Sequence, residues 1–142
     1  MKVEQILRVK GTGVFAVRPD DSIAEAVDVL NDKNIGAVVV RDDGGAVVGI
    51  LSERDIVRRL GRHGSEALGM KVSECMTGEV HTCELEASVD ELMAMMTDRR
   101  VRHLPVTEGG QVVGVVSIGD VVKRKIEEAE QEAAALKEYI AG

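Results

Sequence analysis

The sequence predicts an α/β (α+β) fold of two pseudo-symmetric halves, each with the element order β-α-β-β-α, followed by a C-terminal helix. One observation is that residues recur at a fixed distance along the chain, as Ser22 recurs at Ser88. Another is that each copy contains a helical apolar pattern, followed by two short apolar runs that a glycine-containing turn separates. The period is too long for a solenoid repeat. We therefore expect one domain whose two halves pack on each other through their sheets.

The internal repeat covers most of the chain. Three residues recur 66 positions later, and after a one-residue deletion the next matches lie 65 positions apart. A turn is where a duplicated unit tolerates such a deletion. The first set pairs Ser22, Glu25 and Val40 with Ser88, Glu91 and Val106, and the second pairs Val47, Val48, Gly49, Ser52, Asp55 and Val57 with Val112, Val113, Gly114, Ser117, Asp120 and Val122.

A shorter similarity precedes each copy. Residues 3–7 (VEQIL) resemble residues 72–76 (VSECM), which indicates that a short lead-in helix was duplicated with the rest. An apolar lead-in strand is expected next, at 14–17 in one copy and 80–83 in the other.

Each copy then has a signal for the start of a helix. Ser22-x-x-Glu25 and Ser88-x-x-Glu91 have the pattern of a capping box, in which the two side chains satisfy free amides of the first turn. The next residues place apolar side chains on one helix face, so each helix is expected to dock on a sheet. They are Ile23, Ala26, Val27 and Leu30 in one copy, and Val89, Leu92, Met93 and Met96 in the other.

Two paired strands and a second helix complete each copy. Glycines in the turns at 43–45 and 108–110 supply the positive φ that tight hairpins need. The second helix is expected to begin at Ser52 and at Ser117. The expected strands are 37–40 with 46–51 and 103–106 with 111–116; the expected boundaries are repeat one with its lead-in helix at 1–60, a glycine-rich connector at 61–71, repeat two at 72–125 and the C-terminal helix at 126–142.

The C-terminal segment carries a heptad stripe. Its apolar residues are spaced alternately four and three apart, and charged residues occupy the other faces. The pattern fits either a helix that folds back on its own domain or one that pairs with a second subunit. The stripe consists of Val122, Ile126, Ala129, Ala133, Leu136 and Ile140.

Composition narrows the function classes. The net charge of −7 opposes binding to nucleic acid and to anionic membranes, and the chain has no apolar run long enough to span a bilayer. The start lacks the apolar stretch of a signal peptide, so we expect a cytoplasmic protein. With one Phe, one Tyr and no Trp, the core must be aliphatic. Cys75 and Cys83 are expected to be reduced and buried rather than metal ligands, because no Cys-x-x-Cys or His-x-x-x-His pair is present.

The motif Gly-h-h-Ser-x-x-Asp, in which h is apolar, occurs at 49–55 and again at 114–120. It places a hydroxyl and a carboxylate at the start of a helix. One interpretation is a further capping box. The other is a ligand site, because free amides at a helix N-terminus suit a phosphate and a nearby carboxylate can accept both hydroxyls of a ribose.

Taken together, the capping boxes, the paired strands and the duplicated Gly-h-h-Ser-x-x-Asp motif resemble a tandem pair of cystathionine-β-synthase-type (CBS) domains, also called a Bateman module. The run Arg100-Val-Arg-His-Leu-Pro-Val106 strengthens the resemblance in the second copy, and the match extends from about Val3 to Arg124. It implies two three-stranded sheets packed about a pseudo-two-fold axis, with two clefts that bind adenosine-containing ligands. No catalytic or DNA-binding domain accompanies the pair, so a stand-alone module is expected.

The resemblance implies two sets of ligand-binding residues, each shared by the two copies. Because Arg102 and His103 align with Gly36 and Ala37, only one set has basic side chains, and we expect it to bind the more highly phosphorylated ligand. The Asp55 set is Ser52, Asp55, Val80, Thr82, Arg102, His103, Leu104 and Pro105, and the Asp120 set is Ser117, Asp120, Val14, Ala16, Gly36 and Ala37.

The expected function is therefore a sensor of AMP, ATP or NAD(H), which shifts the arrangement of the halves or a homodimer contact and so signals to an unidentified effector protein. Catalysis is not expected, because Ser52 with His103 is the only nucleophile and base that can be assembled, and no third residue orients them. One alternative is a structural or partner-docking protein without a physiological nucleotide. Another is a module that binds S-adenosylmethionine or a metal ion.

Overall fold

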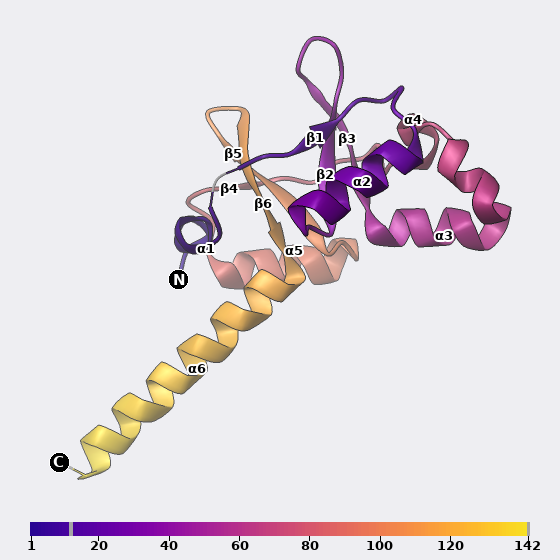
Figure 1. Ribbon diagram of the computed structural model, residues 1–142. Coiled ribbons are helices and arrows are strands. Elements are labelled where there is room, and N and C mark those ends of the chain that lie inside the picture. Colours follow the sequence, from indigo (N-terminus) through magenta and orange to yellow (C-terminus); the bar gives the residue numbers. More distant parts are fainter. Residues whose placement is uncertain (12, 142) are drawn as a thin grey trace. The chain divides into compact units, whose positions relative to one another are not determined.

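The computed structural model describes residues 1–11 and 13–141. The chain forms two compact units: the first-sheet unit is Gly13–His81, and the second-sheet unit combines Met1–Thr12 with Thr82–Gly142. Figure 1 shows the elements of both.

The first-sheet unit contains the first β-α-β-β-α copy. Its sheet has the strand order β1-β2-β3, with β1 parallel and β3 antiparallel to β2. The connector expected at 61–71 holds the end of α3 and a 3₁₀ turn. The elements are β1 (Ala16–Val17), α2 (Ile23–Lys33), β2 (Ala37–Arg41), β3 (Val47–Ser52), α3 (Glu53–His63), the 3₁₀ helix Gly64–Gly69 and α4 (Val72–Cys75).

The second-sheet unit repeats this order, which confirms the predicted β-α-β-β-α duplication. Its sheet has the order β4-β5-β6 with the same directions. The second helix continues without a break across the boundary expected at 125/126. The elements are α1 (Val3–Lys10), β4 (Cys83–Glu84), α5 (Val89–Arg99), β5 (His103–Glu108), β6 (Gln111–Ser117) and α6 (Ile118–Ala141).

The serine half of each predicted capping box forms, whereas among the described residues neither Glu25 nor Glu91 returns a side-chain hydrogen bond to the serine amide. Ser22 Oγ accepts a hydrogen bond from the Glu25 amide (3.1 Å), and Ser88 Oγ accepts one from the Glu91 amide (3.0 Å). Each caps the first turn of its helix. Both cores are aliphatic, as expected; Val38, Val39 and Val40 of β2, for example, are fully buried.

The lead-in helices are exchanged between the units. Both predicted helices exist, but α1 packs in the unit that holds β6, and α4 packs in the unit that holds β3. Leu7 of α1 belongs to the core of the second-sheet unit, and Cys75 of α4 belongs to the core of the first-sheet unit. Each sheet is therefore completed by a helix that precedes the other copy in the sequence.

The glycine of each Gly-h-h-Ser-x-x-Asp motif makes room for this helix. A Cβ added at Gly114 would lie 2.7 Å from Cδ2 of Leu7, and one added at Gly49 would lie 2.5 Å from Sδ of Met76. A Cβ does not approach a carbon or a sulfur atom so closely unless one of them is displaced. The motif glycine is thus a packing residue, at corresponding positions of the two copies.

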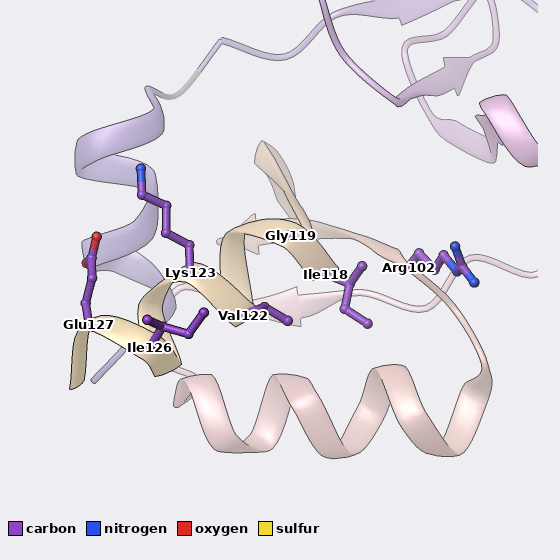
Figure 2. A pocket seen from close by; sticks show the side chains of 7 residues that line it. All are labelled: Arg102, Ile118, Gly119, Val122, Lys123, Ile126 and Glu127. Carbon is purple, nitrogen blue, oxygen red and sulfur yellow. The ribbon is translucent and has the colours of Figure 1, made fainter. Parts of the chain in front are cut away.

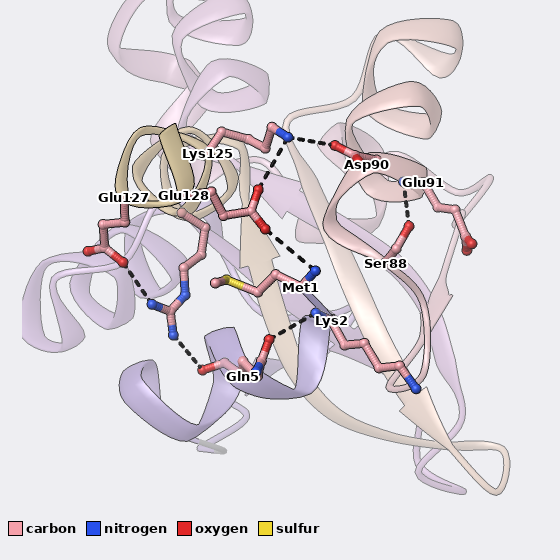
Figure 3. Close-up of polar contacts among 10 residues, drawn as sticks. Met1, Lys2, Gln5, Ser88, Asp90, Glu91, Lys125, Glu127 and Glu128 are labelled. Carbon is pink, nitrogen blue, oxygen red and sulfur yellow. Dashed lines mark hydrogen bonds and ion pairs between the residues drawn. The ribbon is translucent and has the colours of Figure 1, made fainter. Parts of the chain in front are cut away.

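Among the described residues, the polar contacts of α6 with other elements lie near its base. Arg124 donates to the carbonyl of Gln5 (3.2 Å). Lys125 bonds Asp90 of α5 (2.9 Å) and Glu128 (3.2 Å), as Figure 3 shows. Val121 is fully buried, whereas every residue from 131 to 141 is exposed. Within the second-sheet unit nothing covers residues 131–141, so the interpretation that the C-terminal helix folds back along the unit to which it belongs is wrong.

Candidate functional site

The first Ser-x-x-Asp lies at the junction of β3 and α3. Ser52 ends the strand, and its amide and Oγ both donate to Oδ2 of Asp55, over 2.9 and 3.0 Å. The Asp55 amide in turn donates to Ser52 Oγ (3.3 Å). The capping box, which was one of the two interpretations of this motif, is therefore present. Within the described residues all side-chain hydrogen bonds of Asp55 involve Oδ2, so Oδ1 is available to accept from a ligand hydroxyl.

The second Ser-x-x-Asp repeats this geometry and adds a cation. The Ser117 amide donates to Asp120 Oδ2 (2.9 Å), and the Asp120 amide donates to Ser117 Oγ (3.2 Å). Lys10, at the end of α1, places Nζ 2.7 Å from the same Oδ2 and 2.8 Å from the carbonyl of Val115. Burial raises the pKa of the Asp120 carboxyl, but the hydrogen bonds from Lys10 and Ser117 outweigh it and hold that pKa below its ordinary value.

The Lys10 ion pair makes the two motifs unequal. Among the described residues, Asp55 has no corresponding ion pair with a lysine. When residues 3–7 are aligned with residues 72–76, Lys10 corresponds to Glu79, which is acidic. A ligand hydroxyl that approaches Asp120 therefore competes with an ammonium group, whereas one that approaches Asp55 does not.

Hairpin residues lie beside the motif of their own copy. Ala37 pairs in register with Ser52, and the Glu53 amide donates to the Gly36 carbonyl (2.9 Å). In the second copy His103 pairs with Ser117, and the Ile118 amide donates to the Arg102 carbonyl (2.8 Å). Arg102 and His103 thus lie beside Ser117 and Ile118, in the same unit as Asp120. Their expected use beside Asp55 stays a prediction.

The other expected site residues differ in exposure. Leu104 and Pro105 of β5 are buried, and Leu104 belongs to the second-sheet core. Val14 and Val80 are half-buried, and Ala16 and Thr82 are exposed. The side chains of Val14, Ala16, Val80 and Thr82 are therefore open to a ligand, while Leu104 contributes to packing.

A cavity of about 690 Å³ lies along the base of α6. Figure 2 shows that Ile118, Val122 and Ile126 form its apolar floor, with Arg102 at one end. No motif in the sequence marks this surface. The signal was present, however, because Ile118 and Gly119 align with Glu53 and Arg54 of the first copy, so a polar pair is replaced by an apolar and a small residue.

Neither cysteine is placed for metal binding. Cys75 and Cys83 are free and buried, as expected, and the described residues contain no group of three His, Cys, Asp or Glu side chains that could hold a metal ion. Among the same residues, no helix has both the length and the apolarity to cross a bilayer.

The repeated fold and the repeated Ser-x-x-Asp junction define a tandem-repeat protein with one helix-capping hydroxyl and carboxylate pair per copy. The CBS domain family model matches the chain twice, at residues 6–62 and 72–127. The chain belongs to the CBS domain family, as a pair of such domains.

Known proteins similar to the chain agree with this assignment. A mitochondrial CBS domain-containing protein of Arabidopsis thaliana, CBSX3, is 39% identical over 87% of the chain, which spans 62% of that protein's length. Among solved structures, the CBS-domain containing protein ATU1752 of Agrobacterium tumefaciens has 45% identity and a TM-score of 0.83, with 87% of this chain and 92% of that one covered. The CBS domain pair of protein MJ0100, solved with 5′-methylthioadenosine and S-adenosyl-L-methionine, has 26% identity and a TM-score of 0.79, with 90% and 98% covered.

Removing the ammonium group of Lys10 is expected to change stability modestly and in a pH-dependent way. Lys10→Met should lower the free energy of unfolding by about 0.5–1 kcal/mol at pH 7, because the pair is partly exposed. The pKa of Asp120 is depressed in the fold, so this contribution exists above the unfolded pKa of 3.8 and disappears as the pH falls through the folded value.

Urea unfolding of wild type and Lys10→Met at pH 7 and pH 2.5 measures the difference. Asp120→Asn in both backgrounds is the matched control, because it should lower the free energy of unfolding by less once Lys10 is absent. A difference between wild type and Lys10→Met that is as large at pH 2.5 as at pH 7 would contradict the ion-pair explanation.

Proposed function

We propose that this protein is a non-catalytic sensor that binds an adenosine-containing ligand, and that AMP, ATP or NAD(H) is that ligand. The observation that carries the proposal is the Ser52 and Asp55 geometry. The Asp55 carboxylate is held by two hydrogen bonds to Oδ2, and Oδ1 can accept from a ribose hydroxyl. At the start of α3 the Glu53 and Asp55 amides are bonded to the Gly36 carbonyl and to Ser52 Oγ, so the Arg54 amide and the positive end of the helix dipole are what the first turn offers to a phosphate group.

The solved structures support an adenosine ligand as a class. The MJ0100 domain pair was solved with 5′-methylthioadenosine and S-adenosyl-L-methionine, which share the adenosine group. That observation also favours S-adenosylmethionine as a second candidate ligand for this chain. The two candidates differ in charge, because AMP and ATP carry phosphates whereas S-adenosylmethionine carries a sulfonium group.

Ligand binding acts on an effector only through differential affinity. A nucleotide can shift an equilibrium between two arrangements of the protein only if it binds one of them more tightly. We propose that the signal passes to a separate effector protein, and that the sensor itself is a homodimer. The exposed apolar stripe along α6 supports the homodimer.

A thermal-shift panel on nucleotide-free protein tests the ligand. The panel contains AMP, ADP, ATP, NAD⁺, NADH and S-adenosylmethionine, and ligand at ~100 times Kd should stabilise the protein by roughly 2.7 kcal/mol. Titration calorimetry then compares wild type with Asp55→Asn and Asp120→Asn. Asp55→Asn is expected to weaken ATP binding at least about tenfold, because a charged acceptor is lost.

Asp120→Asn is the matched control, since it alters an equivalent helix cap. It should affect ATP less than Asp55→Asn does, because Asp120 is already paired with Lys10. Equal losses from both variants would contradict the proposed difference between the two motifs. No shift with any ligand would instead favour a partner-docking protein.

A further inference from the structure

We propose that α6 pairs with α6 of a second copy in an antiparallel arrangement, in the register where residue i faces residue 255 − i of the partner. The proposal rests on the proposed homodimer and adds its orientation and contacts. Three observations carry it: an uncovered apolar stripe, the alternation of large and small residues along it, and the cavity at its base.

The apolar stripe of α6 is exposed to solvent in the single chain. Val122, Ile126 and Leu136 are 45, 53 and 60% exposed, and they lie on one face of a single helix. The opposite face is occupied, because Val121 is buried and Lys125 is bonded to α5. A contiguous exposed apolar stripe of this kind marks an interaction surface. A second copy supplies an identical stripe of the same length.

Side-chain size selects the antiparallel orientation. In a parallel pair each stripe residue contacts the same residue of the partner subunit, so Ile126 contacts an isoleucine while Ala129 and Ala133 contact alanines. A helix separation that fits the large pairs leaves gaps between the small ones. In the proposed register every layer joins a large residue to a small one: Ile126 with Ala129 of the partner subunit, Val122 with Ala133 of the partner subunit, and Gly119 with Leu136 of the partner subunit. Two-fold symmetry doubles these three layers over a contact of about 27 Å.

The cavity at the base of α6 fits this occupant. The side chain facing Gly119 would be Leu136 of the partner subunit, directed at the floor formed by Ile118, Val122 and Ile126 (Figure 2). Gly119 is not required by its own chain, because an added Cβ would meet only Ser117 Oγ at an ordinary 3.6 Å. Glycine inside a helix costs about 1 kcal/mol relative to alanine. A glycine at this position leaves space for a leucine side chain from a second subunit.

Charge selects the register. In an antiparallel pair, residues that flank the stripe on the same side face each other two positions away from the 255 − i register, so Lys123 faces Glu130 of the partner subunit. A shift of one heptad, to residue 262 − i, would set Lys123 against Lys137 of the partner subunit and Glu130 against Glu130 of the partner subunit. Like charges oppose that register. Charge alone also permits a parallel pair, in which Glu132 faces Lys137 of the partner subunit, so orientation is decided by size.

Cysteine cross-linking of the full chain tests the orientation. Val122→Cys and Ala133→Cys are purified separately, and each is oxidised alone and after mixing. The proposal expects a disulfide-linked dimer only in the mixture, because residues 122 and 133 face each other while identical positions lie about 16 Å apart. Wild type, with its buried cysteines, is the control. Cross-linking of either variant alone would show a parallel pair and overturn the proposal.

Exchange of the large and small residues is an independent test. Gly119→Leu is expected to raise the dimer Kd at least about tenfold while each subunit stays folded. The double variant Gly119→Leu with Leu136→Ala restores one large and one small residue per layer, so it should recover most of the affinity. Failure of this rescue would contradict the layer pairing.

Sedimentation velocity over a range of concentrations distinguishes a failure of the α6 pairing from a failure of the proposed homodimer. A dimer without the 122 to 133 cross-link overturns the proposed pairing and leaves the homodimer standing. A monomer at all concentrations overturns both. Nucleotide titrations of the same samples show independently whether the ligand proposal holds.

Discussion

Gly114→Ala is expected to lower the free energy of unfolding by about 1–3 kcal/mol, because its Cβ would lie 2.7 Å from Cδ2 and 3.1 Å from Cδ1 of Leu7. Leu7→Ala removes those atoms and should itself cost about 2–5 kcal/mol, since Leu7 is buried in the core of the second-sheet unit. The two costs should not add. In the double variant the new methyl group occupies space that Leu7 has left, so the summed loss overestimates the measured one.

Chemical denaturation of the four proteins in this double-mutant cycle measures the coupling. Gly61→Ala is a matched control: it is also a glycine in a regular element, but open space surrounds its added Cβ, so it should stabilise α3 by about 0.5–1 kcal/mol. The equivalent cycle at Gly49 should show weaker rescue by Met76→Ala, because the Thr77 carbonyl also lies 3.0 Å from the added Cβ and remains in place. Strict additivity at Gly114 would mean that α1 does not limit the space there.

This exchange of lead-in helices is the part of the fold that the sequence could not predict. Periodicity, capping boxes and glycine turns are local signals, and they placed the helices and hairpins to within a few residues. Residues 3–7 and 72–76 look like parts of their own copies, because they directly precede them. Only packing shows that Leu7 meets Gly114 rather than Gly49. The predicted packing of the two halves through their sheets stays a prediction.

The candidate site was predictable where it depends on chain neighbours. Ser52 and Asp55 are three residues apart at a helix start, so their mutual hydrogen bonds follow from helix geometry. Lys10 is 110 residues from Asp120, and no local pattern links them. The same limit applies to Arg102. Its alignment with Gly36 predicted that the two sets of site residues differ in charge, but its position beside Ile118 depends on the pairing of β5 with β6, which the sequence does not show.

Cys83 is expected to react with thiol reagents far more slowly in the folded protein than in the unfolded chain. Burial raises the pKa of its thiol from 9.0 to about 11, so at pH 8 its thiolate fraction falls about 100-fold. Burial also raises the pKa of Cys75. Labelling with iodoacetamide in Cys75→Ser, with and without denaturant, isolates the Cys83 rate. Equal rates in the two conditions would contradict a buried thiol in β4.

The same pKa gives stability a defined pH dependence on the alkaline side. The thiol ionises at 9.0 in the unfolded chain and at about 11 in the fold, so its contribution is complete below pH 9 and is lost as the pH rises toward 11. Wild type should therefore lose its stability margin over Cys83→Ala across that interval, while Cys83→Ala itself lacks this thiol titration. Denaturation midpoints at pH 7, 9 and 10.5 for both proteins measure the difference. A margin that stays constant from pH 7 to 10.5 would show that Cys83 is solvated in the folded state, and would place β4 outside the apolar core to which Leu92 and Val106 belong.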